Sequence, residues 1–70
     1  VQIAQIVTTA RTQAQDAINA AIDGGGDQKE IDKAMEQMAE AQIDIDGGQS
    51  DKAIKHYCNA WENAQKAIAP

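Results

Sequence analysis

The chain has 70 residues and a formal net charge of −5, and 14 of its 30 apolar residues are Ala, with no Leu or Phe. That length allows one domain, residues 1–70, with a small core. The charge argues against nucleic acid or anionic membranes as direct partners, because both demand a basic surface. No apolar run approaches the roughly 18–20 residues of a membrane span, so membrane insertion is not expected. Because Ala fills little volume, we expect a thin core, with closely packed helices or apolar surface that a partner buries.

Three further features of the composition bear on origin and compartment. The chain has nine Ile and no Leu, which indicates either an unusual natural sequence or a sequencing method that cannot distinguish Leu from Ile. The pattern of aliphatic positions is the same in both cases. The single cysteine, Cys58, excludes an internal disulfide. The chain begins with Val1 rather than Met, which is typical of a processed or trimmed protein or of a fragment. An extracytoplasmic location is our working interpretation.

The first predicted element is a helix over residues 2–23, followed by glycines at 24–26. Glycine reaches the left-handed conformation in which helices commonly end, so this cluster predicts a stop. Apolar residues recur along the segment at steps of four and three, which is typical of an amphipathic helix in a bundle. Because this seam is mostly Ala, we expect the first helix to pack closest, with Ile6, Ile18 and Ile22 beside the seam. The seam consists of Ile3, Val7, Ala10, Ala14, Ala17 and Ala21.

The second predicted helix spans residues 28–45 and ends before the glycines at 47–48. Asp27, with Glu30 three residues later, has the spacing of a capping box, with Asp in place of the usual Ser or Thr. The apolar positions again recur at helical spacing, which predicts one buried face. This face carries Ile31, Ala34, Met35, Met38, Ala41 and Ile45.

An acidic ridge follows the opposite face of this second helix. Each pair of like charges four residues apart destabilises an isolated helix by roughly 0.2–0.5 kcal/mol. A solvated face that keeps the domain soluble is one interpretation, and a divalent-cation site is another. The third is docking on a basic partner surface, for which we expect salt-sensitive binding. The acidic ridge consists of Asp32, Glu36, Glu40 and Asp44 at i, i+4 steps.

Residues 44–48 are similar to part of an EF-hand calcium loop. If Gly47 took the sixth position of such a loop, Gln42 and Ala53 would take the first and twelfth, where carboxylates are required. The sequence therefore assigns no metal ligands here. Asp and Gly at a helix end are the simpler interpretation.

The third predicted helix spans residues 51–68, with Ser50 as its cap and Asp51 in its first turn. Short loops make neighbouring helices antiparallel, so the sequence predicts an all-α, up-down-up three-helix bundle. The apolar face of the third helix includes Tyr57 and Trp61, the only aromatic residues. They are either core anchors or partly exposed binding residues, since Trp and Tyr are enriched at binding hot spots.

Part of the third helix resembles known helical modules. Six residues stand at the spacing of the second helix of a tetratricopeptide repeat, namely Gly48, Asp51, Ala53, Ile54, Tyr57 and Ala60. The stretch 48–61 therefore resembles half of that repeat, although 34–47 lacks the anchors of the other half and Gln65 stands where Pro is expected. Residues 51–61 are also similar to the closing helix of small helical modules in bacterial extracytoplasmic proteins. Both resemblances imply interaction or spacing rather than catalysis.

Two short segments recur within the chain. Residues 22–25 and 45–48 share the sequence Ile-Asp-Gly-Gly, and residues 32–35 align with 51–54. Recurring helix-stop and helix-start chemistry explains this similarity, and duplication of a helix–loop unit is the alternative.

His56 and Cys58 are the residues of the third helix with reactive side chains. They are two positions apart and do not share a helical face. We expect His56 on the polar side with Lys52, Lys55 and Asn59, and Cys58 at the edge of the apolar face. The sequence contains no haem or zinc signature, and no base or oxyanion hole for nucleophilic catalysis is identifiable. We therefore predict no catalytic residue, metal ligand, cofactor or small-molecule substrate.

The sequence leaves three functional hypotheses. The first is a non-enzymatic interaction module or accessory subunit that docks on a larger protein, with Trp61, Tyr57 and the acidic ridge as candidate partner-binding residues. The second is an autonomous structural or spacer domain of an exported or surface protein. The third is a metal- or cofactor-binding bundle associated with a redox enzyme.

Overall fold

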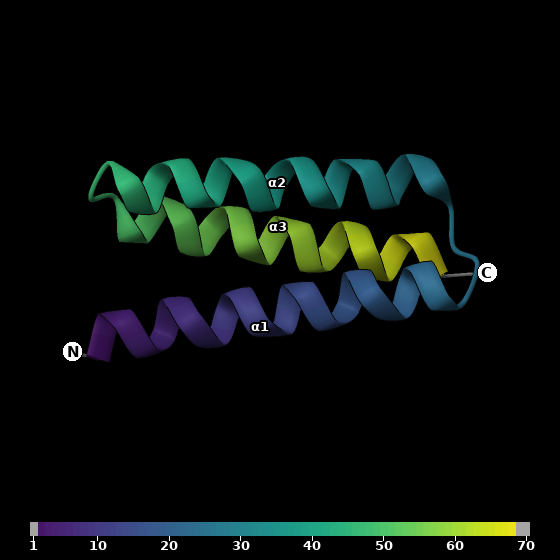
Figure 1. Cartoon of the computed structure of the whole chain (residues 1–70), viewed down its shortest axis with the longest axis horizontal. Helices are drawn as coiled ribbons and strands as arrows, with labels where there is room; N and C mark the ends of the chain where they lie inside the picture. The colour runs from purple at the N-terminus through teal and green to yellow at the C-terminus, as the bar shows by residue number, and fades with distance from the viewer. Residues whose placement is uncertain (1, 69–70) are drawn as a thin grey trace.

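The computed structural model describes the backbone of residues 2–68 and the side chains of residues 5–68. Most of these residues belong to three helices, α1 (Gln2–Asp23), α2 (Gln28–Asp46) and α3 (Ser50–Ile68), and no strand occurs among them. The predicted all-α, up-down-up bundle is confirmed, with α2 and α3 each one residue longer than expected (Figure 1). None of the described helices is long and apolar enough to cross a membrane.

The middle position in the bundle belongs to α3, which lies between the other two helices (Figure 1). Its contact with α2 is the most extensive, its contact with α1 is smaller, and α1 touches α2 at few positions. The Cα atoms span 37 × 18 × 14 Å, so the bundle is elongated and thin. The expectation that the first helix packs closest is wrong, because α2 and α3 also bring fully buried alanines to the core. These are Ala34, Ala41, Ala53, Ala60 and Ala64.

The core is thin, as the composition predicts. Nine of the 13 buried apolar residues that the structure describes are Ala, and the largest side chains with less than 2% exposure are Tyr57 and Ile18. The seam of α1 is buried at four of its positions and partly buried at Ala10, while the side chain of Ile3 lies outside the described ones. The four buried positions are Val7, Ala14, Ala17 and Ala21.

Several large apolar side chains lie outside this core. Met35 was expected on the buried face of α2 but is 52% exposed, because the fully buried Ala34 occupies the position that faces the core. Successive residues of a helix are turned by about 100°, so Met35 is directed away from it. Ile6 and Ile22 flank the seam of α1 as predicted, yet both remain half exposed. The closely packed alanines therefore leave part of the apolar surface uncovered.

The two turns between helices have the same construction, which agrees with their shared Ile-Asp-Gly-Gly sequence. The second glycine of each shared segment adopts the left-handed conformation, with φ of +70° and +77°, where other residues are strained. The next N–H donates back to the preceding helix in each turn, from Gly26 to the Ala21 carbonyl at 2.8 Å and from Gln49 to the Asp44 carbonyl at 2.7 Å. These are Schellman-type helix ends, so both glycine clusters stop a helix as predicted.

The start of α3 differs from the prediction by one residue. The Ala53 N–H donates to the Gln49 carbonyl at 3.1 Å, which places Gln49 rather than Ser50 at the cap position. The N–H of Gln49 already closes α2, so a single residue ends one helix and begins the next.

The turn between α1 and α2 is also tied to the end of α3. The Asp27 N–H donates to the Ala67 carbonyl at 2.9 Å, which satisfies one of the last carbonyls of α3 that lack an intrahelical partner. A Cβ at Gly26 would lie 2.8 Å from the same oxygen, so this approach requires glycine. The predicted capping box forms only in part. Asp27 accepts the N–H of Lys29 at 3.0 Å, but its own N–H goes to Ala67 rather than to Glu30.

Candidate functional site

The structure separates the predicted partner-binding residues into two groups. Tyr57 and Trp61 line a hollow that α3 shares with α1, where Tyr57 is 1% exposed and Trp61 is 45% exposed. The acidic ridge lies on α2, where three of its acids are exposed and Asp44 is half-buried. The aromatic and acidic residues are therefore not brought into one site. Tyr57 occupies a core position and Trp61 an accessible one.

An open groove runs between α1 and α3. It consists of three adjoining hollows with volumes of about 680, 330 and 500 Å³. Ala10, Gln13 and Cys58 line both the first and the second hollow, and Gln13 and Trp61 line both the second and the third. Because the hollows share their walls, they form one continuous surface, which we call the α1–α3 groove.

Helical periodicity explains why this groove is continuous. The α1 wall is built on Ile6, Ala10, Gln13 and Ala17, and the α3 wall is built on Ile54, Cys58, Trp61 and Gln65. Both sets step by four, three and four residues, so each forms a stripe along its helix. The first and third helices of an up-down-up bundle run in the same direction (Figure 1). The two stripes therefore lie side by side along their length.

The α1–α3 groove is mostly apolar, although Gln13 lines all three hollows and polar side chains line much of the hollow around Asp16 and Gln65. Ile6 is 53% exposed within it, and the free thiol of Cys58 is also exposed. Asp16 and Glu62 are its only charged lining residues, each in a hollow that Trp61 also lines, and no basic side chain is among the described residues that line it. Large apolar side chains left exposed together in a groove make this surface a candidate for contact with another molecule.

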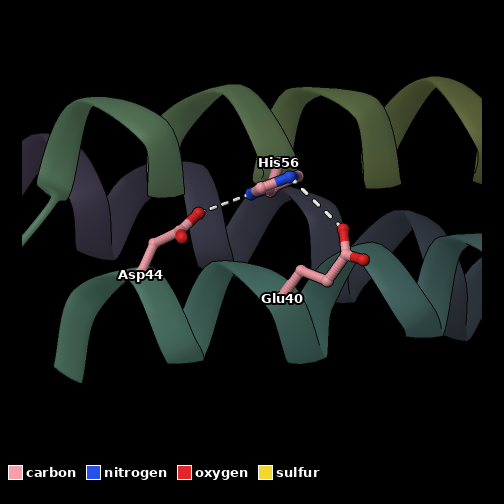
Figure 2. A network of polar contacts seen from close by, with 3 residues as sticks. All are labelled: Glu40, Asp44 and His56. Atoms are coloured by element: carbon pink, nitrogen blue, oxygen red, sulfur yellow. Dashed lines mark hydrogen bonds and ion pairs between the residues drawn. The ribbon is translucent and has the colours of Figure 1, made fainter. Parts of the chain in front are cut away.

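A second polar feature joins α2 to α3 (Figure 2). His56 of α3 lies between two acids of the acidic ridge, with Nδ1 at 2.5 Å from Oδ2 of Asp44 and Nε2 at 3.3 Å from Oε2 of Glu40. An ionised carboxylate only accepts, so the Asp44 contact is a hydrogen bond when Nδ1 carries the hydrogen, whereas the Glu40 contact is an ion-pair distance. The sequence places His56 on the polar side of α3, and the structure adds that this position faces α2, so its side chain is only 29% exposed and meets the two acids.

This His56 cluster has the geometry of a structural contact. The two carboxylates approach opposite edges of the imidazole, so the three side chains do not converge on one point (Figure 2). Within residues 2–68, no group of three or more His, Cys, Asp or Glu side chains is placed to hold a metal ion. A general base also needs a ring nitrogen that can reach the substrate, and in His56 both nitrogens already face a carboxylate. The cluster links two helices and gives no geometric support to metal binding or acid–base chemistry.

Half of the groove is not predicted from the sequence. The spacing identifies Trp61 as a candidate, but it assigns Ala10 and Ala17 to the buried seam and gives no role to Gln13. One signal could have revealed the wall. Ile6 and Gln13 lie on one side of the seam and, together with the seam residues Ala10 and Ala17, repeat its four-three-four spacing.

In comparisons with known proteins, no family model, curated protein sequence or solved structure matches the chain significantly. The resemblances of the third helix to half of a tetratricopeptide repeat and to the closing helix of bacterial extracytoplasmic modules therefore remain predictions.

Proposed function

We propose that this protein is a non-enzymatic interaction module that docks on a larger protein through the α1–α3 groove. The observation that carries the proposal is Trp61, which is 45% exposed in a continuous apolar groove together with the half-exposed Ile6. Trp is among the residues that contribute most to protein interfaces. Covering the exposed parts of these two side chains contributes on the order of 1 kcal/mol each.

The size of the core supports the same proposal. A domain of 70 residues buries only about 60% of the surface of its unfolded chain and is commonly marginal in stability. Among residues 5–68 most buried apolar residues are Ala, while six large apolar side chains are exposed, and two of these, Ile6 and Trp61, line the groove. A partner that covers the groove would therefore stabilise the fold as well as bind it.

The acidic ridge is a weaker candidate for the docking surface. Glu40 and Asp44, two of its four acids, already face His56 within the protein. Asp32 and Glu36 remain exposed on α2. Docking through the ridge, with four acids in a row, predicts binding that weakens strongly with salt, whereas docking through the groove, with two acids at one end, predicts a smaller dependence on salt.

Cys58 offers a direct test, because it is the only cysteine and it lines the groove. A photo-crosslinker attached to this thiol should join the protein to one discrete partner in an extract of its natural source. The matched control is Cys58→Ala with Glu36→Cys, which places the same label on α2. The result expected is a crosslinked product from Cys58 that is absent from the control and lost in Trp61→Ala.

Circular dichroism must show that the Trp61→Ala variant remains helical. If both labelled positions give the same products, or if neither gives a product, the docking proposal fails. An autonomous spacer domain is then the better description.

A further inference from the structure

We infer that the groove accepts one amphipathic helix of the partner, which places a cationic side chain against Trp61 between Asp16 and Glu62. This inference rests on the proposed function and adds the chemistry of the partner.

The walls of the groove favour a helix over an extended segment. They consist of side chains from two regular helices, α1 and α3, whose interior backbone groups are paired within each helix. An extended peptide would therefore bury backbone N–H and C=O groups without partners, which costs roughly 1–3 kcal/mol for each group. A helix satisfies its own backbone and presents only side chains to an apolar groove.

The length of the groove fits about three helical turns. Its α1 wall runs from Gln5 to Ala17, which at about 1.5 Å per residue corresponds to roughly 18 Å. A partner helix of about 12 residues would therefore face the whole groove. Its apolar stripe would lie parallel to the stripes of α1 and α3, as in a four-helix bundle.

The charges of the groove are grouped near Trp61. Asp16 lines one hollow beside the indole and Glu62 lines the other, and the hollow around Ile6 and Ile54 has no charged lining residue. Neither Asp16 nor Glu62 is in an ion pair among the described residues. An aromatic ring flanked by carboxylates favours a cation, because the ring face and both carboxylates attract positive charge. We therefore place Arg or Lys of the partner helix at this end and apolar side chains at the Ile6 end.

A second copy of the chain fits this groove less well. Each copy carries a net charge of −5, and a symmetric contact through the groove would bring in the Asp16 and Glu62 carboxylates of both chains. Like charges placed together in an interface disfavour association. The charge of the groove is complementary to a basic partner and not to itself.

The test uses three synthetic helical peptides of about 14 residues that contain no Trp. All share one apolar stripe of Ile and Leu, and they carry Arg, Gln or Glu at one end of the stripe; reversed sequences cover the opposite direction. Binding is followed through the fluorescence of Trp61, the only Trp in the chain. We expect the Arg peptide to bind about tenfold more tightly than the Gln peptide, and the Glu peptide to bind most weakly.

Matched protein variants locate the effect. Asp16→Asn with Glu62→Gln should reduce the preference for Arg to about twofold, because only the indole remains to attract the cation. Asp32→Asn with Glu36→Gln removes the same charge from α2 and should leave the preference unchanged. All four residues are exposed, so both variants should fold.

The outcomes separate this inference from the proposed function. Equal binding of the Arg, Gln and Glu peptides would overturn the cationic anchor. Failure of every peptide, while the label at Cys58 still captures a partner, would overturn the helical occupant and leave docking in place. A dimer of the free chain that shields Trp61, seen by analytical ultracentrifugation and fluorescence, would show that a second copy is the occupant.

Discussion

The two sides of α3 differ although both are built on small residues. Toward α2, fully buried alanines bring the helices together, and long side chains close the edge where His56 meets Glu40 and Asp44. Toward α1, the neighbours of the indole in the groove include Ala10 and Ala17, whose side chains are too short to cover Trp61. Ala lets helices approach on both sides, and the flanking residues decide whether the interface closes. We interpret the closed side as holding the fold and the open side as available to a partner.

The largest effect on stability is expected at Tyr57, which is 1% exposed and lies at the base of the groove. Replacing a buried aromatic residue with Ala costs about 3–5 kcal/mol. A domain of this length has a free energy of unfolding of only roughly 3.5–10 kcal/mol. The Tyr57→Ala variant should therefore be largely unfolded at 37 °C and show no cooperative unfolding transition there. Thermal unfolding followed by circular dichroism measures this, with Tyr57→Phe as the control that keeps the ring. A Tyr57→Ala variant as stable as the control would show that the core lies elsewhere.

The second effect concerns the turn that ties α1 and α2 to the end of α3. In Gly26→Ala the new Cβ would lie 2.8 Å from the Ala67 carbonyl oxygen and 3.0 Å from that of Ala21. Both are backbone atoms, so the turn must move, at a cost of about 1–3 kcal/mol. Gly47→Ala is the matched control, because its nearest neighbour is at 3.5 Å, and it should change the free energy of unfolding by less than about 0.5 kcal/mol. Urea denaturation compares the two, and equal losses would contradict the described approach of Gly26 to Ala67.

The third effect tests the closed side of α3. His56→Gln should lower the free energy of unfolding by about 1 kcal/mol, because it breaks the contact with the half-buried Asp44. A double-mutant cycle with Asp44→Asn isolates this contact from other effects of the substitution. The cycle with Glu40→Gln should give a smaller coupling, since that pair is 3.3 Å apart and the Glu40 side chain is 51% exposed. Additive effects in both cycles would show that the contacts of His56 with Asp44 and Glu40 do not stabilise the packing of α2 on α3.

The smallest effect on stability is expected in the groove. Ile6→Ser and Trp61→Ser change side chains that are half exposed, so each should lower the free energy of unfolding by only about 1 kcal/mol, the contribution of the half that is buried. The same variants should abolish crosslinking from Cys58. If either variant loses more than about 2 kcal/mol of stability, its side chain contributes to the core and the contrast between the two sides of α3 disappears.

The sequence predicts the helices well because their boundaries depend on local chemistry. Glycine clusters and aliphatic spacing determine where each helix begins and ends, and these signals are contained in the turns themselves. Spacing alone does not determine which of two adjacent apolar residues faces the core. Met35 and Ala34 both fit the predicted face of α2, and the structure buries only Ala34.

The candidate site was harder to predict because it depends on the order of the helices in space. The spacing of α3 gives no information on whether His56 meets solvent or α2, since that depends on which helix packs on which side. The same holds for Ile6 and Gln13. They form a groove wall only because α1 packs against α3, while α2 lies on the other side of α3. Local patterns predicted the elements, and the packing of three elements produced the groove.

The most direct test of the central claim is the accessibility of Trp61 to a neutral quencher. Trp61 is the only Trp in the chain, and it is 45% exposed in the groove. Acrylamide quenching should be efficient in the free monomer and should fall sharply once the partner captured through Cys58 is bound. Shielding of Trp61 already in the free monomer, or unchanged quenching in the complex, would contradict the claim that the α1–α3 groove is the docking surface.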